Sequence, residues 1–126
     1  MLVVDLDKDG YDDVLAADAG ANAVAWYPGS LAGFGPANMV DAALSFDPTY
    51  TTRGAYAIDL DADGDIDILA ADFEGGSSSD GALYWYANDG DQTFTNKQLV
   101  FDTGASDAAV YALDLDGDGD ADVLAA

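Results

Sequence analysis

Hydrophobic and polar positions alternate along this chain in short segments that are typical of β-strands. A short apolar run leads into an aspartate-rich segment, which is followed by a second apolar run and then by a segment that ends in Trp-Tyr. Strand residues point to opposite faces with a period of two, whereas a helix needs apolar residues at a period of about 3.6. The sequence does not have the helical period, and the pattern therefore predicts an all-β protein.

This order of segments occurs twice and then begins a third time. The polar segments start at Asp5, Asp59 and Asp114, which are 54 and 55 residues apart. Each polar segment runs into nearly the same apolar text, Val-Leu-Ala-Ala or Ile-Leu-Ala-Ala. This regularity predicts a single continuous repeat array. Its expected units are repeat 1 at residues 1–54, repeat 2 at 55–109 and the first half of repeat 3 at 110–126.

Each full repeat is expected to contain four short strands. In the second repeat the expected strands are Tyr56–Asp59, Ile66–Ala71, Ala82–Tyr86 and Phe94–Phe101. In the first repeat, Gly35 interrupts the expected fourth strand. Four strands in about 55 residues are typical of one blade of a β-propeller. The predicted fold is therefore a set of propeller-type blades of four antiparallel strands, with two and a half repeats in this sequence.

Each repeat carries an aspartate-rich loop between its first two expected strands. Counted from Asp5, Asp59 or Asp114, aspartates stand at positions 1, 3, 5 and 9, and a glycine stands at position 6. Calcium takes six to eight oxygen ligands, which closely spaced aspartates on a tight turn can supply. Glycine permits the bend, because it adopts positive φ without steric cost. The loops therefore predict a calcium-binding protein with about three Ca²⁺ ions, one in each loop.

The charge of the chain narrows its expected partners. The 126 residues include 25 acidic and 3 basic side chains, which gives a net charge of −22. A surface this acidic repels nucleic acid and anionic membranes, so that neither is expected as a partner. No apolar run approaches the length needed for membrane insertion, and the first residues do not have the pattern of a signal peptide.

The side chains that enzymes use most often are missing from the sequence. The chain has no Cys and no His, which excludes disulfides and argues against zinc or haem chemistry and against Ser/His/Asp or Cys/His catalytic sets. Paired carboxylates can act as general acid and base, but the clustered aspartates are better explained as metal ligands. We therefore expect no catalytic residues and a protein that is not an enzyme.

Taken together, these motifs resemble the FG-GAP/VCBS repeat, which also occurs in the β-propeller of integrin α-subunits. The resemblance rests on Asp-Leu-Asp-x-Asp-Gly-x-x-Asp, on the Val/Ile-Leu-Ala-Ala that follows it, and on the Trp-Tyr segment with its glycine turn. It covers essentially the whole chain and implies four-stranded blades that hold calcium in the hairpin between the first two strands.

The resemblance also implies which residues bind calcium. The side-chain ligands would be Asp5, Asp7, Asp9, Asp13, Asp59, Asp61, Asp63, Asp67, Asp114, Asp116, Asp118 and Asp122. Backbone carbonyls at loop position 7 would add Tyr11, Asp65 and Asp120. An EF-hand has a bidentate Glu at position 12 and flanking helices, whereas here that position is Ala and the flanks are strand-like, which argues against an EF-hand sensor.

The resemblance further implies an extracellular or cell-surface protein. The expected function is that of a non-enzymatic, calcium-binding structural or cell-adhesion module, which self-assembles or forms part of a larger surface protein or fibre. Its expected partners are neighbouring repeats or copies of itself, together with glycans or surface proteins. The alternative is a carbohydrate-binding or polysaccharide-degrading propeller domain of a secreted protein, in which Trp26 and Trp85 stack on sugars. Packing of these two side chains between blades is the favoured explanation.

Overall fold

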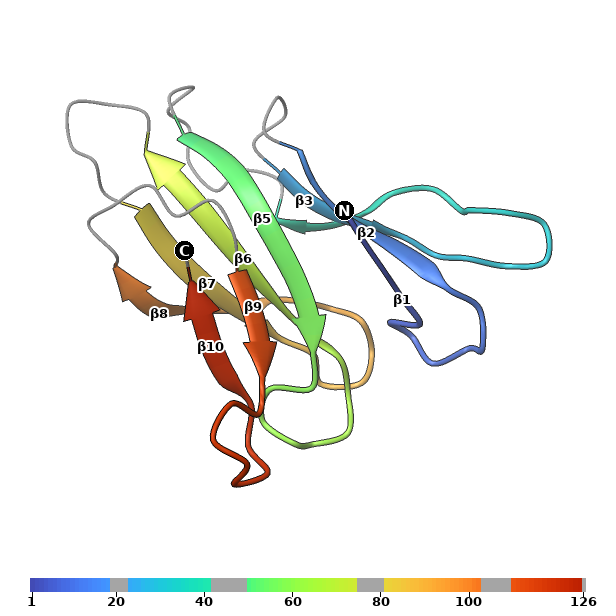
Figure 1. Cartoon of the computed structure of the whole chain (residues 1–126). Helices are drawn as coiled ribbons and strands as arrows, with labels where there is room; N and C mark the ends of the chain where they lie inside the picture. Colours follow the sequence, from blue (N-terminus) through green and yellow to red (C-terminus); the bar gives the residue numbers. More distant parts are fainter. Residues whose placement is uncertain (19–22, 42–49, 75–80, 103–109, 126) are drawn as a thin grey trace.

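The computed structural model describes the chain except for residues 19–22, 42–49, 75–80, 103–109 and 126. The described residues form ten β-strands in three separate antiparallel sheets (Figure 1). Within these ranges no helix is present that is long and apolar enough to cross a membrane.

The strands of each sheet lie side by side in chain order. The first sheet contains β1 (Leu2–Val4), β2 (Asp13–Asp18), β3 (Ala23–Tyr27) and β4 (Asn38–Asp41). The second contains β5 (Tyr50–Ile58), β6 (Asp67–Glu74), β7 (Gly81–Ala87) and β8 (Asn96–Asp102). The third contains β9 (Val110–Leu113) and β10 (Asp122–Ala125). The all-β class and the two four-stranded antiparallel units are confirmed; the described strands form open sheets, and propeller closure is not seen among them.

Several strands differ in extent from the sequence expectation: β6 continues to Glu74, β8 begins at Asn96, and β4 and β5 differ as follows. β4 begins at Asn38, because the preceding segment is held in a loop in which the Gly35 N–H donates to the Pro28 carbonyl oxygen at 2.7 Å. β5 begins at Tyr50, before the apolar run that the sequence pattern marks, and pairs with β6 along nearly its whole length. Backbone pairing with a long neighbour has extended this strand beyond its apolar residues.

The register of the strands is the same in the two four-stranded sheets. Leu15 lies opposite Trp26 in the first sheet, and Leu69 lies opposite Trp85 in the second. Because strand residues alternate between faces, this register places both Trp side chains on the same face of their own sheets.

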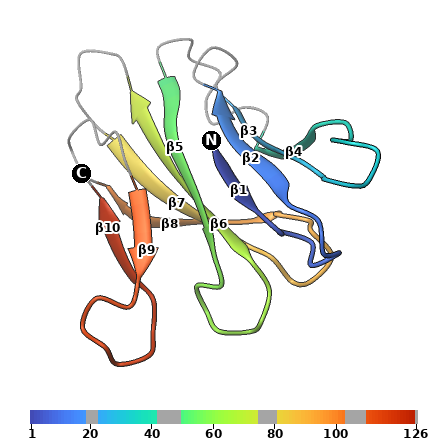
Figure 2. The same cartoon turned by 45° about the vertical axis from the view of Figure 1, so that its right-hand side comes forward.

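One apolar core lies between the first and second sheets, which stand side by side in Figure 2. The first sheet contributes Leu15, Val24 and Trp26, and the second contributes Ile68, Ala70 and Tyr86. All six side chains are buried. The two tryptophans are part of the packing between sheets, since Trp26 belongs to this core and Trp85 packs against the next one.

A second core lies between the opposite face of the second sheet and the third sheet. It contains Leu69, Ala71 and Leu83 from the second sheet, and Val110 and Ala112 from the third. β6 is therefore buried on both faces, which explains its uninterrupted apolar run Ile68–Ala71. The small alanines in this run leave room for a neighbouring sheet on each side.

A polar cluster joins the edge strands of the first two sheets. Lys97 Nζ on β8 lies 3.0 Å from Asp41 Oδ2 on β4. The Tyr86 hydroxyl donates to the same oxygen at 2.8 Å, and Lys97 Nζ lies 4.0 Å from the centre of the Tyr84 ring. One ammonium group thus compensates a carboxylate and covers an aromatic face at the boundary between sheets.

Replacing Ile68 by Ala is expected to lower the free energy of unfolding by about 2–4 kcal/mol, because it leaves a cavity in the core between the first two sheets. The matched change Leu99→Ala removes an exposed side chain on β8 and is expected to have little effect. Urea unfolding in saturating calcium measures both variants. Equal losses in the two variants would contradict the packing described here.

Candidate metal centres

The three aspartate-rich loops lie at the same end of the molecule (Figures 1 and 2). They connect β1 to β2, β5 to β6 and β9 to β10, each an antiparallel pair. Antiparallel pairing brings the end of one strand beside the start of the next, so that loop position 9 lies beside loop position 1. The hairpin itself therefore gathers residues that are distant along the loop.

Each loop brings three carboxylates together. One ligand oxygen from each residue lies within 4.8 Å of the others in all three clusters. The clusters are Asp5, Asp7 and Asp13; Asp59, Asp61 and Asp67; and Asp114, Asp116 and Asp122. Nine of the residues expected to bind calcium are thus brought together, at loop positions 1, 3 and 9 of each repeat.

The carboxylate at position 1 is held by the glycine at position 6. The backbone N–H of Gly10 donates to Asp5 Oδ2 at 3.1 Å, and Gly64 does the same to Asp59 at 3.0 Å. Gly10 has φ of 92° and Gly64 has φ of 99°, as the tight bend requires. Lys8, at position 4 of the first loop, also has positive φ (59°). A lysine at this position gave no sign of that conformation.

The remaining expected ligands form hydrogen bonds within their own loops. The carboxylate at position 5 accepts a hydrogen bond from the backbone N–H at position 7, as in Asp9 with Tyr11 and Asp63 with Asp65, both at 2.8 Å. The residues at position 5, namely Asp9, Asp63 and Asp118, lie outside the three clusters found in the described part of the chain. At position 7, Tyr11, Asp65 and Asp120 donate these hydrogen bonds.

The carboxylate at position 9 is the most constrained. Asp13 is fully buried; its Oδ2 accepts from the Leu6 N–H at 2.8 Å and its Oδ1 accepts from the Gly29 N–H at 2.6 Å. Asp67 repeats the arrangement, with the Asn88 N–H donating to its Oδ1 at 2.8 Å. This residue therefore ties the loop to the segment that follows the third strand of the same sheet.

Gly29 and Asn88 stand in the turns that follow the Trp-Tyr segments, and their residue types do not mark them as partners of the aspartates. Gly29 follows Asp13 by 16 residues, and Asn88 follows Asp67 by 21. Trp26 follows Asp5 by 21 residues and Trp85 follows Asp59 by 26, which is the same difference of five. This shared shift was the signal available in the sequence.

The clusters fit a hard divalent cation. Asp5 Oδ1 and Asp59 Oδ1 are buried and have no hydrogen-bond donor among the described groups, so that their lone pairs are left for a cation. Burial raises the pKa of Asp7, against a hydrogen bond from the Asp9 N–H, and the charges of nearby carboxylates raise it further. Burial also raises the pKa of Asp67. A bound cation would favour the charged form of both carboxylates.

The contact between neighbouring loops differs between the two pairs of adjacent sheets. Lys8 Nζ of the first loop lies 3.2 Å from Asp65 Oδ1 of the second loop. The equivalent of Lys8 in the second loop is Ala62, and a space of about 530 Å³ is present there between the second and third loops. The three clusters are also unequally covered, since the residues of the third cluster are all exposed.

Repeated antiparallel sheets, each with an oxygen-rich loop in its first hairpin, define a β-repeat protein with a carboxylate cluster in each of these loops. A family model described as FG-GAP-like repeat matches residues 5–70 and again residues 59–125. The chain belongs to the FG-GAP-like repeat family, which confirms the resemblance seen in the sequence. The comparison with curated proteins and the comparison with solved structures gave no match.

Replacing Gly29 by Ala is expected to destabilise the first sheet without altering any carboxylate. A Cβ at this position would clash with the Asp12 carbonyl oxygen, so that the Gly29 N–H must move away from Asp13. The expected loss in unfolding free energy is about 1–3 kcal/mol. Leu31→Ala, at an exposed position nearby, is the control. Unchanged urea unfolding of the Gly29→Ala variant would show that this contact does not hold the loop.

Proposed function

We propose that each of the three loops binds one Ca²⁺ ion and that calcium fixes the first hairpin of each sheet. The observation that carries this proposal is the repetition of one carboxylate cluster, with the same hydrogen bonds, in three hairpins. Because the same arrangement is repeated, the three loops are expected to have the same function. Membership of the FG-GAP-like repeat family supports this proposal.

The choice of calcium follows from the donor set. All donors in the clusters are carboxylate oxygens, which suit calcium, magnesium or manganese rather than zinc or copper. Magnesium demands near-ideal octahedral geometry, whereas calcium accepts six to eight ligands in flexible arrangements. Three aspartates from positions 1, 3 and 9 would supply part of this number, and the carbonyl at position 7, the carboxylate at position 5 and water would supply the rest.

Calcium would reduce the repulsion between carboxylates, and little chain entropy would be lost on binding because the loop already holds the oxygens close together. Once bound, the ion neutralises carboxylates that repel one another, and the chain positions the three oxygens for it before it arrives. Asp13 and Asp67 hold their loops against the body of the sheet through backbone N–H groups. Binding would therefore stabilise the sheet and not the loop alone.

Calcium is expected to raise the melting temperature, and chelation is expected to lower it. If each site has a Kd near 10⁻⁴–10⁻³ M, about 10 mM calcium contributes roughly 1.4–2.7 kcal/mol per site. Asp7→Asn is expected to remove the contribution of the first site. Differential scanning calorimetry in calcium and in EDTA, together with calorimetric counting of bound ions, measures both effects.

Asp12→Asn is the matched control, because it makes the same charge change in the same loop at an exposed residue outside the cluster. Its calcium stoichiometry should equal that of the parent chain. The proposal is abandoned if EDTA leaves the melting temperature unchanged, or if Asp12→Asn and Asp7→Asn lose the same number of ions.

We further propose that the chain is a non-enzymatic structural or adhesive module of an extracellular or cell-surface protein. The family match supports the role of a repeat module. Millimolar extracellular calcium would saturate sites of the affinity expected for extracellular modules. Metal binding would explain the clustered aspartates without acid–base chemistry, which favours a non-enzymatic role.

The sheets are proposed to be propeller-type blades whose outer faces pack on further blades, in neighbouring repeats or in other copies of the chain. Leu15 and Leu69 are buried at the two contacts between sheets. Leu124 occupies the equivalent position on β10 and is 50% exposed, and Tyr111 beside it is 53% exposed. The face that carries them has the same apolar pattern as the two faces that are covered.

This chain is therefore expected to self-associate in millimolar calcium and to dissociate on chelation. Leu124→Ser should weaken the association, whereas Leu99→Ser, at an exposed position on β8, should not. Sedimentation velocity at micromolar concentration measures both variants. A parent chain that remains monomeric in calcium would contradict docking between copies and would leave neighbouring repeats as the partner.

A further inference from the structure

The third aspartate loop differs from the other two in how its position-1 carboxylate is bonded. In all three loops the N–H of the glycine at position 6 donates to Oδ2 of this carboxylate. In the first two loops, Oδ1 of Asp5 and of Asp59 is buried and accepts no hydrogen bond from a described group. In the third loop, the Gly117 N–H donates to Asp114 Oδ1 at 2.6 Å. The oxygen that the other loops leave for a cation is therefore already bonded here.

The residue at loop position 4 accounts for this extra bond. It is Lys8 in the first loop, Ala62 in the second and Gly117 in the third. All three have positive φ, which is 59° at Lys8, 60° at Ala62 and 83° at Gly117. Residues with a Cβ stay near the left-handed minimum at about 57°, whereas glycine moves freely beyond it. The larger φ is found at the glycine, which is also the position-4 residue whose N–H bonds to Oδ1 of the position-1 carboxylate.

The position-9 carboxylate of the third loop is also held by fewer contacts. Asp13 and Asp67 are fully buried, and each accepts N–H groups from its own loop and from the segment after the third strand. Asp122 is exposed and, among the described groups, accepts only the Leu115 N–H, at 2.9 Å. A ligand that its neighbours already hold in place loses less freedom when a cation binds. The third loop therefore starts from a less restrained set of ligands.

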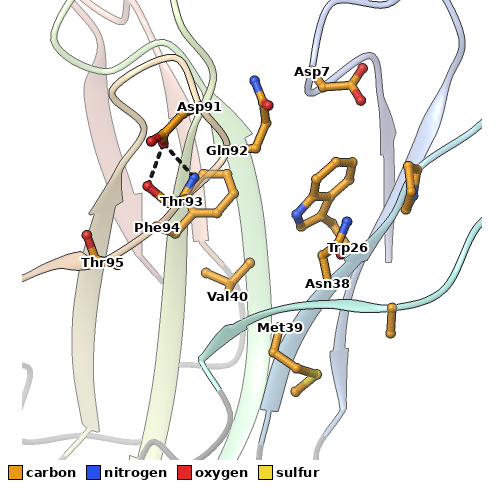
Figure 3. A pocket seen from close by; sticks show the side chains of 12 residues that line it. Asp7, Trp26, Asn38, Met39, Val40, Asp91, Gln92, Thr93, Phe94 and Thr95 are labelled. Carbon is orange, nitrogen blue, oxygen red and sulfur yellow. Dashed lines mark hydrogen bonds between the residues drawn. The ribbon is translucent and has the colours of Figure 1, made fainter.

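The surroundings of the clusters differ in the same direction. Figure 3 shows Asp7 of the first loop across a cavity of about 710 Å³ from Gln92 and Phe94, which lie between β7 and β8 of the second sheet. The first and second clusters each contain one buried carboxylate, whereas all three carboxylates of the third cluster are exposed. Water and salt screen exposed charges, which weakens their attraction for a cation.

We propose that the third loop binds calcium at least about tenfold more weakly than the first two loops, and that Gly117 is the main cause. A cation at Asp114 Oδ1 must displace the Gly117 N–H or share the oxygen with it, and a hydrogen bond to a charged group is strong enough for this difference. The inference rests on the proposed calcium binding and concerns its regulation. The first two hairpins would be fixed together, and the third only at a higher calcium concentration.

The test is equilibrium dialysis of the chain against ⁴⁵Ca²⁺ from about 10 µM to 10 mM free calcium, a range that spans the affinities expected of extracellular modules. Two ions should bind in a lower range of concentration and the third in a range at least about tenfold higher. Asp116→Asn should remove the weakly bound ion, because Asp116 belongs to the third cluster. Asp7→Asn should remove one of the tightly bound ions instead.

Gly117→Ala tests the cause of the difference. Apart from its chain neighbours, nothing lies within 4 Å of a Cβ at this position, so that the side chain has room. The backbone is expected to relax toward the φ of 60° that Ala62 adopts, which withdraws the N–H from Asp114 Oδ1. The third ion should then bind at least about threefold more tightly. The reciprocal change Ala62→Gly should weaken one tight site by about the same factor, and it decides the test if Gly117→Ala does not fold.

Gly33→Ala is the matched control, since it makes the same change at a glycine of positive φ (106°) that also has room for a Cβ and lies outside the aspartate loops. It should leave the binding of all three ions unchanged. A ¹⁵N NMR spectrum supplies a second measurement. At the calcium concentration that fills two sites, the Gly117 amide proton should resonate far downfield, as short hydrogen bonds to carboxylates do, and it should move upfield when the third ion binds.

The outcomes separate this inference from the proposed calcium binding on which it rests. Three ions that bind in a single step would overturn the inference and leave calcium binding in place, whereas a chain that binds no calcium would overturn both. Loss of a tightly bound ion in Asp116→Asn would contradict the weaker third site. An unchanged affinity for the third ion in folded Gly117→Ala, or a Gly117 amide signal that the third ion does not move, would contradict the role of Gly117.

Discussion

The buried carboxylate at loop position 9 is the constraint on which the rest of the structure depends. Asp13 and Asp67 are fully buried, and each accepts backbone N–H groups from its own loop and from the segment after the third strand. A buried charge is tolerated only when it is hydrogen-bonded or paired with a cation. The same side chain therefore fixes the loop, joins it to the sheet and belongs to the carboxylate cluster. Asp122, at the equivalent place in the third loop, accepts from Leu115 and is exposed.

Packing on both faces of the second sheet gives the molecule its shape. Alternate residues of β6 enter two different cores, so that Ile68 and Leu69 are both fully buried although they point in opposite directions. A two-sided sheet of this kind has no room for charge in its centre. The carboxylate clusters consequently lie in the loops between strands, where cations can compensate them. Figure 2 shows these loops at one end of the molecule.

Two of the three basic side chains, Lys8 and Lys97, lie where sheets meet. Lys8 pairs with Asp65 across the first two loops, and Lys97 pairs with Asp41 across the edge strands. Neither pair is fully buried, so each contributes modestly to stability. Each pair joins two adjacent repeats and reduces the repulsion between their carboxylates, which matters in a chain of net charge −22.

The sequence by itself determined the all-β class, the repeat period and the loop residues of the clusters. These features are local, because the strand period, the glycine at position 6 and the spacing of aspartates act within one hairpin. Only the tertiary structure decided that Asp13 and Asp67 are buried, and that Gly29 and Asn88 hold those buried carboxylates. It also decided which faces of the sheets are covered. These outcomes depend on contacts between segments that lie 16 or more residues apart, which no local pattern specifies.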